Sequence, residues 1–206
     1  MKIETFVIGM IGTNCYLVSN TDTRECVLID PAVYSPGITG QIRREGLVLK
    51  AILLTHGHFD HIMGIDGFLK EFDVPVYAHK EEQALLKDAV LNASADYGRS
   101  YIYQGASYVE DGQALDLAGM HFQVLYTPGH TIGGCCYYVE EEHVLFSGDT
   151  LFRASVGRSD LPTGNGSELL DSIRKKLMVL PEETAVYPGH MEKTSIGYEK
   201  HYNPYL

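Results

Sequence analysis

Short apolar runs separated by turns dominate the first half of the chain. Such runs of about four to eight residues, alternating or continuous, are typical of β-strands. They predict strands over residues 2–8, 14–19, 26–29, 51–54 and 75–78. Helices are predicted between them, over residues 35–45, 62–72 and 80–88. The first helix has Ser35 at the N-cap and Pro36 at the first helical position, and it stops at Gly46.

The second half repeats this arrangement. Strands are predicted over residues 114–117, 121–126, 135–139, 144–146 and 184–187. A helix that starts at Ser167-Glu168 carries Leu169, Leu170, Ile173 and Leu177 on one face. Two halves of strands and helices predict an α/β (α+β) protein, in which two mixed sheets pack face to face with helices outside. No low-complexity linker divides the chain, so this four-layer αββα sandwich is expected to form one domain over residues 1–206.

Residues 89–108 interrupt the regular pattern and carry four tyrosines, Tyr97, Tyr101, Tyr103 and Tyr108. Half-buried tyrosine rings commonly pack on a protein while their hydroxyl ends stay polar. Aromatic side chains in loops beside pockets also contact ligands. The segment is therefore interpreted either as surface packing or as a flap over a site.

The composition is that of a globular protein with a substantial core: of 206 residues, 45% are hydrophobic and 21% are charged. The formal net charge is -11, and the longest basic run is only three residues, Arg174-Lys175-Lys176, with Arg43-Arg44 the next. Because an acidic surface repels phosphate backbones, no nucleic-acid partner is expected. No apolar run is long enough to span a bilayer, so no membrane partner is expected either.

The cysteines and the first residues bear on the compartment. Residues 1–6 lack the basic start and apolar core of a signal peptide. Four cysteines are present, namely Cys15, Cys26, Cys135 and Cys136, and none forms a Cys-x-x-Cys pair. Adjacent Cys135 and Cys136 would point to opposite faces of a strand, which disfavours a disulfide between them. These features predict reduced thiols in a cytoplasmic protein.

The densest candidate chemistry follows the predicted strand at 51–54. Residues 56–61 read His56-Gly57-His58-Phe59-Asp60-His61, which places three imidazoles and a carboxylate in six positions. Three more candidates stand at later strand ends: His130, Asp149 and His190. Both of these histidines follow Pro-Gly, where a rigid and a permissive residue aim the imidazole. Packing alone does not require seven such side chains at four strand ends, so the pattern indicates a metal site.

Their spacing indicates how these residues divide between metals. Where the backbone turns at a strand end, His56 and His58 can converge on one metal, and Asp60 and His61 can reach a second. Asp149 has two carboxylate oxygens and can bridge two cations. Imidazole and carboxylate ligands suit two divalent ions, with zinc expected first and iron or manganese as alternatives. The sequence thus predicts a two-metal hydrolase.

This pattern resembles that of the metallo-β-lactamase-fold hydrolases over nearly the whole chain. Their motif His-x-His-x-Asp-His stands at residues 56–61, and their later His, Asp and His match His130, Asp149 and His190. The resemblance implies two ligand sets bridged by Asp149. The first is His56, His58 and His130. The second is Asp60, His61 and His190.

In such a site two cations lower the pKa of a shared water, and the resulting hydroxide attacks a carbonyl or phosphoryl centre. The cations then stabilise the oxyanion and the leaving group, a role that a thiolate suits. Asp60 is both a ligand and a neighbouring carboxylate. It is therefore the predicted catalytic residue, which orients the nucleophile and shuttles its proton.

A further resemblance narrows the range of candidate substrates. Residues 152–160 contain Gly157-Arg158-Ser159-Asp160 and resemble a Gly-Arg-x-Asp segment of glyoxalase II-like proteins and of the related persulfide dioxygenases. Arg158 can donate two hydrogen bonds to a substrate carboxylate such as that of glutathione, or it can pair with Asp160 and order its own loop. Residues 195–206 resemble the end of the short, single-domain branch of glyoxalase II-like proteins, where a structural role is expected for Tyr198, His201 and Asn203.

The resemblance implies a thioesterase that cleaves S-(hydroxyacyl)glutathione or a similar small thioester, as a monomer or a homodimer. Two features depart from full-length glyoxalase II. The sequence ends shortly after His190, so no C-terminal glutathione-binding helical domain is expected. His190 is followed by Met191-Glu192, where the family more usually has Gly and a small or apolar residue.

The main alternative is a persulfide dioxygenase-like oxidoreductase, in which a single iron held by His56, His130 and Asp149 activates oxygen. The complete second ligand set and the sequence Asp-Leu-Pro-Thr-Gly at residues 160–164 favour the hydrolase. A non-catalytic metal-binding protein would need an incomplete site, and no ligand is missing. β-Lactam hydrolysis in a bacterial envelope would call for an export signal, which residues 1–6 lack.

Overall fold

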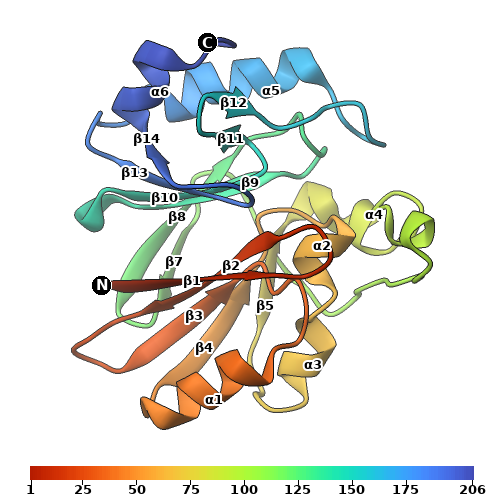
Figure 1. Cartoon of the computed structure of the whole chain (residues 1–206), viewed down its shortest axis with the longest axis vertical. Helices are drawn as coiled ribbons and strands as arrows, with labels where there is room; N and C mark the ends of the chain where they lie inside the picture. The colour runs from red at the N-terminus through yellow and green to blue at the C-terminus, as the bar shows by residue number, and fades with distance from the viewer.

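Two six-stranded sheets lie face to face in the computed structural model, which describes all 206 residues (Figure 1). The first sheet consists, in order, of β1 (Lys2–Ile8), β2 (Thr13–Ser19), β3 (Glu25–Ile29), β4 (Val48–Leu53), β5 (Val76–His79) and β6 (Ser107–Val109). The second consists, in order, of β14 (Thr194–Ser195), β13 (Ala185–Pro188), β10 (Val144–Gly148), β9 (Cys135–Val139), β8 (Met120–Tyr126) and β7 (Ala114–Leu117). A separate hairpin is formed by β11 (Leu151–Phe152) and β12 (Ser155–Val156).

Both sheets are mixed, and helices cover their outer faces. In the first sheet, β1, β2 and β3 are antiparallel, whereas β3 to β6 run parallel. In the second sheet only β10 and β13 are parallel. Helices α1 (Pro36–Arg44) and α3 (Ile65–Leu69) lie on the first sheet, and α5 (Gly166–Ser172) and α6 (Ile196–Tyr202) lie on the second (Figure 1). The predicted αββα sandwich of two mixed sheets is confirmed.

The central strands are apolar on both faces because each sheet packs on a helix layer and on the other sheet. Along β2, Tyr16 and Val18 join the core between the sheets, whereas Cys15 and Leu17 join the core under the outer helices. Cys135 and Cys136 on β9 divide in the same way between the inner core and the outer core beneath α5. All four cysteines are buried and free. The predicted opposite orientation of Cys135 and Cys136 is therefore confirmed.

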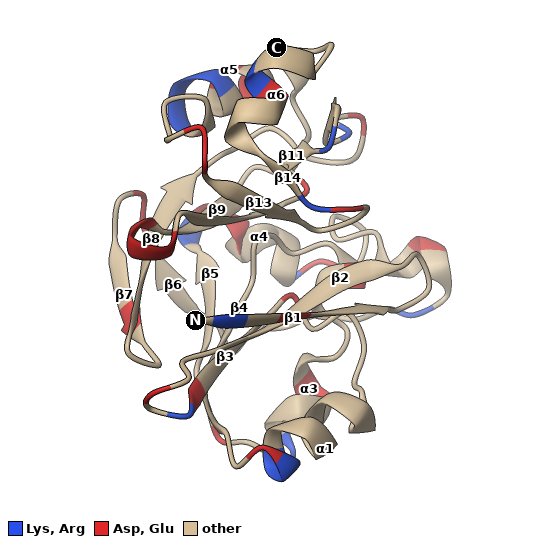
Figure 2. Ribbon diagram, turned by 60° about the vertical axis from the view of Figure 1, so that its left-hand side comes forward, with Lys and Arg blue, Asp and Glu red and all other residues tan.

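Charged residues are carried mostly by the helices and turns that surround the sheets (Figure 2). Lys and Arg lie among Asp and Glu on most of these elements, and the longest basic stretch, Arg174-Lys175-Lys176, lies on the helical turn that continues α5 (Figure 2). No helix of the protein combines the length and apolar character that crossing a bilayer would require.

The predicted helix at 62–72 is wrong in its start and its continuity. The chain forms α2 (Phe59–Ile62) within the ligand run and then α3, with a break at Met63 and Gly64. At this break the Gly64 N–H donates to Pro31 O (2.8 Å), and a Cβ on Gly64 would lie 2.4 Å from the same oxygen. A tertiary contact therefore interrupts a pattern that is locally compatible with one helix.

Other boundaries differ by smaller amounts. Residues 80–88 form a 3₁₀ turn, η1 (Lys80–Glu82), and a short α4 (Gln83–Leu86) instead of one helix. Ser35 stands at the N-cap of α1, but its side chain makes no capping hydrogen bond. Helix α5 is capped by Asn165, which accepts hydrogen bonds from the Ser167 and Glu168 N–H groups, and a π-helical turn, η4 (Ile173–Leu177), follows it. The sequence had not predicted β14 or α6 at the end of the chain.

Candidate metal centre

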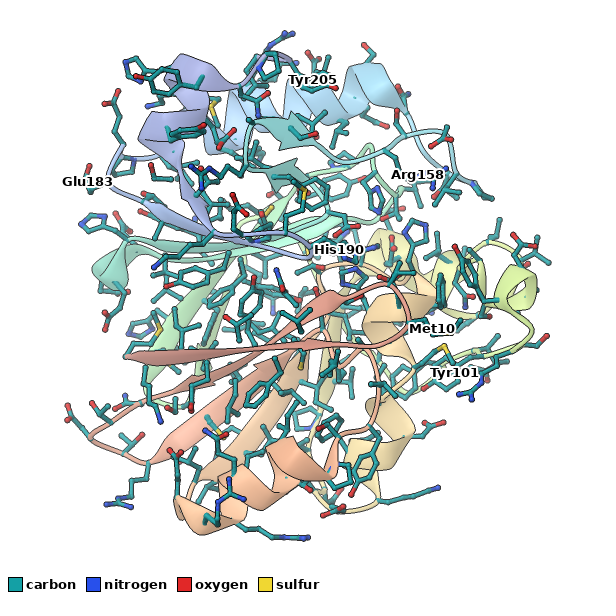
Figure 3. All side chains as sticks on the ribbon, in the orientation of Figure 1. Met10, Tyr101, Arg158, Glu183, His190 and Tyr205 are labelled. Carbon is teal, nitrogen blue, oxygen red and sulfur yellow. The ribbon has the colours of Figure 1, made fainter.

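The seven predicted ligands lie at the carboxyl ends of four strands, where the two sheets meet. β4 leads into residues 56–61, and β8, β10 and β13 lead to His130, Asp149 and His190. His190 lies centrally between the two layers in Figure 3. The ligand atoms form three overlapping groups, within each of which all atoms lie within 4.8 Å of one another. The fold thus brings together every side chain that the sequence identified as a ligand.

The first ligand group consists of His56, His58 and His130. The His130 Nε2 atom lies 2.9 Å from His58 Nδ1 and 3.3 Å from His56 Nε2. All three side chains are buried, and burial lowers the pKa of each. At neutral pH these imidazoles are therefore uncharged, and their ring nitrogens converge on one point.

The second ligand group consists of Asp60, His61 and His190. The Asp60 Oδ2 atom lies 3.2 Å from the Nε2 atoms of both histidines. Burial opposes ionisation of Asp60, but His61 and His190 outweigh it and hold the pKa of the carboxyl below its usual range. Burial lowers the pKa of His61, but the carboxylates of Asp60 and Asp149 raise it by more. The net shift of the His61 pKa is therefore upward. This group is therefore charged, unlike the first.

Asp149 stands between the two ligand groups. Its Oδ1 atom lies 3.5 Å from His61 Nε2, and its Oδ2 atom lies 3.5 Å from His190 Nε2 and 3.6 Å from His130 Nε2. One carboxylate thus faces ligands of both groups, as the predicted bridging role requires.

The buried polar atoms of this cluster fit metal ions. His61 Nε2 and Asp149 Oδ1 are buried without a hydrogen-bond partner and face one another. Buried polar atoms are rarely left unpaired, because each would cost about 1–3 kcal/mol. The ring nitrogens of the first group are spaced 2.9 and 3.3 Å apart, and two nitrogens on a tetrahedral zinc are separated by about 3.3 Å. The donor set of imidazoles and carboxylates suits two divalent transition-metal ions.

Two glycines let the backbone beside the ligand histidines pack closely on its neighbours. A Cβ on Gly189 would lie 2.2 Å from Asp149 Oδ1 and 2.7 Å from His61 Cε1. Gly129 has φ +130°, and a Cβ there would lie 2.2 Å from the Leu169 N atom of α5. Both Pro-Gly-His segments therefore use glycine where the backbone packs closely, against the ligand cluster at Gly189 and against α5 at Gly129.

Asp30 is a supporting residue that the sequence analysis missed. Its Oδ2 atom lies 2.9 Å from His61 Nδ1 and accepts a hydrogen bond from Thr55 Oγ1 (2.6 Å), and its Oδ1 atom accepts one from Thr55 N (2.8 Å). A carboxylate behind a metal-ligating histidine fixes the ring orientation and raises the basicity of the ligand nitrogen. Asp30 directly follows β3, so the strand-end pattern that identified the ligands would also have found it.

Two other contacts orient ligand side chains. Thr13 Oγ1 donates to Asp60 Oδ2 (2.7 Å), from the start of β2. The Arg158 carbonyl oxygen lies 2.7 Å from His130 Nδ1, which leaves His130 Nε2 to face the first ligand group. Both contacts come from residues far away in sequence, so no local sequence pattern predicts them.

A cleft of about 440 Å³ opens on both ligand groups. Its floor includes His58, Asp60, His130, Asp149 and His190. Its walls are more apolar and contain Ile11, Phe59, Tyr97 and Leu161, with Arg158 among them. Volume and composition are those of a small-molecule site, in which a few polar groups fix orientation.

Arg158 lies at this cleft, and its guanidinium is also paired. Its Nε and Nη2 atoms donate to the two carboxylate oxygens of Asp160 at 2.7 and 2.8 Å. The Arg158 side chain is 59% exposed. In Figure 3 Arg158 lies above and to the right of His190. The loop-ordering pair is thus present, and the position remains compatible with contact to a ligand.

The four tyrosines of residues 89–108 divide between the two interpretations. Tyr97, in the 3₁₀ turn η2 (Ser94–Tyr97), stacks on Phe59 with ring centroids 4.1 Å apart and lines the cleft. Tyr101, Tyr103 and Tyr108 instead pack against the core beneath the first sheet. Only Tyr97 is therefore placed to contact a ligand.

His79 and the residues of the tail lie outside the cleft. His79 stacks on Tyr126, with ring centroids 4.2 Å apart, and belongs to no ligand group. In the tail, Asn203 donates to Ser155 O (3.0 Å) on the β11–β12 hairpin and to Glu199 Oε2 (2.7 Å). These contacts anchor α6 to the hairpin that precedes Arg158, which agrees with the expected structural role of the tail.

Two facing mixed sheets, with histidines and aspartates gathered where their strands end, define the class of metallo-β-lactamase-fold proteins. The sequence profile of the Metallo-beta-lactamase superfamily matches residues 8–190. The chain belongs to the metallo-β-lactamase superfamily.

Curated relatives cover the whole chain. It is 39% identical over 208 residues to the Bacillus subtilis protein named "Probable metallo-hydrolase YqgX", covering 100% of this chain and 98% of the relative. It is 32% identical over 209 residues to the "Hydroxyacylglutathione hydrolase GloC" of Haemophilus influenzae, again covering 100% and 98%.

Solved structures agree with this assignment. The BLEG-1 B3 metallo-beta-lactamase is 40% identical, with a TM-score of 0.93 and coverage of 100% of this chain and 99% of that one. TTHA1623 in a di-iron-bound form is 36% identical, with a TM-score of 0.88 and coverage of 98% and 100%. ETHE1 from Myxococcus xanthus is 30% identical, with a TM-score of 0.80 and coverage of 99% and 84%.

Proposed function

We propose that this metal-dependent hydrolase is a glyoxalase II-like thioesterase, which cleaves S-(hydroxyacyl)glutathione or a similar small thioester. The observation that carries the proposal is the pair of complete ligand groups that share Asp149 and open on one cleft. A 32% identical relative named a hydroxyacylglutathione hydrolase supports the substrate class.

The protein's own residues divide the work of such a reaction. When bound, two divalent cations supply Lewis acidity, which acidifies water and polarises a carbonyl. The first ligand group and Asp149 would hold one cation, and the second ligand group and Asp149 would hold the other. Asp60, fixed by Thr13, is proposed as the catalytic carboxylate that orients the attacking water.

The cleft offers separate surfaces for the two ends of a thioester. Arg158 would donate two hydrogen bonds to a carboxylate of the thiol portion, after exchanging Asp160 for the substrate. Phe59, Tyr97 and Leu161 would pack on the aliphatic parts. Zinc is the proposed metal, and iron is the first alternative, since the TTHA1623 structure is described as di-iron-bound.

The persulfide dioxygenase-like reaction is the second candidate, because His56, His130 and Asp149 alone can hold a single iron. One feature opposes it. Asp60, His61 and His190 form a complete additional group, which a mononuclear oxygenase does not need. The thioesterase is therefore preferred.

A cytoplasmic location is proposed from the four free, buried cysteines, since free thiols are typical of reducing compartments. Whether the chain acts as a monomer or a homodimer stays a prediction.

The test combines metal analysis with a substrate panel. Purified protein is expected to contain about two divalent ions per chain and to hydrolyse S-lactoylglutathione faster than acyl-coenzyme A thioesters. The panel also includes glutathione persulfide with an oxygen electrode, and a chromogenic cephalosporin. One iron per chain with oxygen uptake would replace the proposal by the dioxygenase, and turnover of the cephalosporin alone would replace it by β-lactam hydrolysis.

A further inference from the structure

Glu82 is a fully buried carboxylate that belongs to neither ligand group. It ends the η1 turn after β5 and has 0% exposed surface. A buried carboxylate is costly unless it is paired or hydrogen-bonded, so its surroundings must supply donors. Its hydrogen-bond partners include no lysine, no arginine and no predicted ligand.

The carboxylate of Glu82 bridges the two loops that carry the first ligand group. Its Oε1 atom accepts a hydrogen bond from Gly57 N (2.7 Å), in the peptide between His56 and His58. Its Oε2 atom accepts hydrogen bonds from Gly133 N (2.7 Å) and Thr131 Oγ1 (3.1 Å), in the loop that follows His130. One side chain thus fixes the separation of the two loops.

Both loops pack closely on the segment that carries Glu82. A Cβ on Gly133 would lie 2.1 Å from Glu82 N and 2.4 Å from Glu82 Oε2. A Cβ on Gly57 would lie 2.8 Å from the Leu85 side chain of α4. Both loops therefore approach the η1–α4 segment through glycines, and the carboxylate fills the space between them.

Direct backbone bonding does not hold these loops together at the ligands. The nearest backbone hydrogen bond between the two segments runs from Cys135 N to Thr55 O (2.9 Å), outside the ligand positions. Within residues 56–58 and 130–133, the connection consists of the Glu82 carboxylate and the facing rings of the first ligand group. Three uncharged imidazoles do not attract one another strongly, so their convergence needs external support.

We propose that Glu82 is a positioning residue, which holds the loop of His56 and His58 against the loop of His130 so that the first ligand group is formed before a cation binds. This inference rests on the proposed metal-dependent function. Both oxygens of Glu82 must act as acceptors for this role, because each faces a backbone N–H group, so the carboxylate is ionised in the metal-bound protein.

Glu82→Gln is the decisive variant, with Glu81→Gln as its matched control. The glutamine amide keeps the shape of the side chain, but it directs an N–H donor against one of the two backbone donors. Glu81 is the exposed neighbour of Glu82, so its substitution changes charge equally without touching either loop.

Zn²⁺ affinity is measured for the wild type and both variants by competition with a chromophoric chelator. Metal-free unfolding curves are recorded alongside, as is the visible spectrum of each Co²⁺-loaded protein. The tighter of the two Zn²⁺ ions is expected in the first ligand group. We expect Glu82→Gln to bind this ion about 10–100-fold more weakly, the range typical of groups that orient metal ligands. Its Co²⁺ spectrum should also change, whereas Glu81→Gln should match the wild type.

Unchanged Zn²⁺ affinity and an unchanged Co²⁺ spectrum in folded Glu82→Gln would overturn the inference. If this variant does not fold, Thr131→Val removes one donor and leaves both backbone contacts, and it should weaken Zn²⁺ binding several-fold; wild-type affinity would overturn the inference there. A wild-type protein that binds Zn²⁺ but hydrolyses no thioester would defeat the proposed substrate and leave the role of Glu82 intact.

Discussion

The two ligand groups lie in one cleft and share Asp149, but they differ in charge and in support. The first consists of three buried, uncharged imidazoles and is backed by the Glu82 bridge. The second contains a carboxylate, and its His190 side chain is 19% exposed. The first group therefore resembles a preformed core site, whereas the second is a charged site open to the cleft. We expect the cation of the second group to exchange more readily.

The backbone beside the second ligand group includes a residue in a strained conformation. Met191 follows His190 with φ +66°, in the left-handed region that favours glycine. Asn14 holds this loop by donating from Nδ2 to Pro188 O and Met191 O, both at 2.9 Å. The Gly that the family more usually has after this histidine would adopt the same conformation without strain.

The largest expected effect comes from Asp149, because it is the residue that both groups share. Asp149→Asn removes the charge and keeps the volume, and we expect kcat/KM to fall on the order of a thousandfold, the scale of losing one preorganised charge contact. Elemental analysis should show loss of metal as well. Retention of both metals and of more than a tenth of wild-type turnover would contradict the bridging role.

The second prediction concerns pH and the support of the first group. Burial raises the pKa of Glu82 from its ordinary 4.5 to about 7, against the opposing effect of its hydrogen bonds from Gly57, Thr131 and Gly133. Between pH 4.5 and about 7 the folded state therefore binds more protons than the unfolded state. Protonated Glu82 contributes stability that is fully present below pH 4.5 and is lost as the pH rises through about 7. The loss is roughly 3 kcal/mol at most.

Glu82→Gln lacks this titration, so the difference in unfolding free energy between the wild type and the variant should change between pH 5 and 8. Urea unfolding of the metal-free proteins measures it, since cations nearby would favour the ionised carboxylate. A difference that stays constant over this range would contradict the prediction.

The third prediction tests the support of the second group. Asp30→Asn weakens the hydrogen bond to His61 and should lower metal affinity or activity about 10–100-fold. Chelator titration should show that the weaker cation is lost first while the tighter one is retained. Equal weakening of both cations would show that the two groups do not act separately.

The fourth prediction separates the two readings of Arg158. If Arg158 binds a substrate carboxylate, Arg158→Ala should raise KM for S-lactoylglutathione about tenfold with little change in kcat, the mark of uniform binding. Asp160→Asn should then lower KM, because it frees the guanidinium. If the pair instead orders the loop, both variants should raise KM.

The smallest effect is expected at Met191. Met191→Gly should raise the unfolding free energy by about 0.5–1 kcal/mol, since relief of the left-handed backbone outweighs the added freedom of the unfolded chain. Thermal unfolding of the metal-free protein measures this change, and Met191→Ala, which keeps the strain, should show no gain. An unchanged unfolding free energy in Met191→Gly would mean that the left-handed backbone at residue 191 does not destabilise the protein.

The ligands and the layers were predictable because they are encoded locally. Ligands such as His56 and His58 stand two residues apart at the end of an apolar strand, and the alternation along each strand reports which faces are buried. Asp30 was missed although it also follows a strand. The helix predicted at 62–72 failed because Gly64 bonds to Pro31, a contact that no window around residue 64 contains.

By itself, the sequence determined the sandwich of two mixed sheets and the residues that can bind metal, since apolar periodicity and ligand density are properties of neighbouring positions. Only the tertiary structure decided that Glu82 joins two ligand loops, that Tyr97 alone of its segment lines the cleft, and that the two ligand groups differ in charge. These depend on which groups meet across the fold, because burial and electrostatic shifts are set by three-dimensional neighbours and not by sequence spacing.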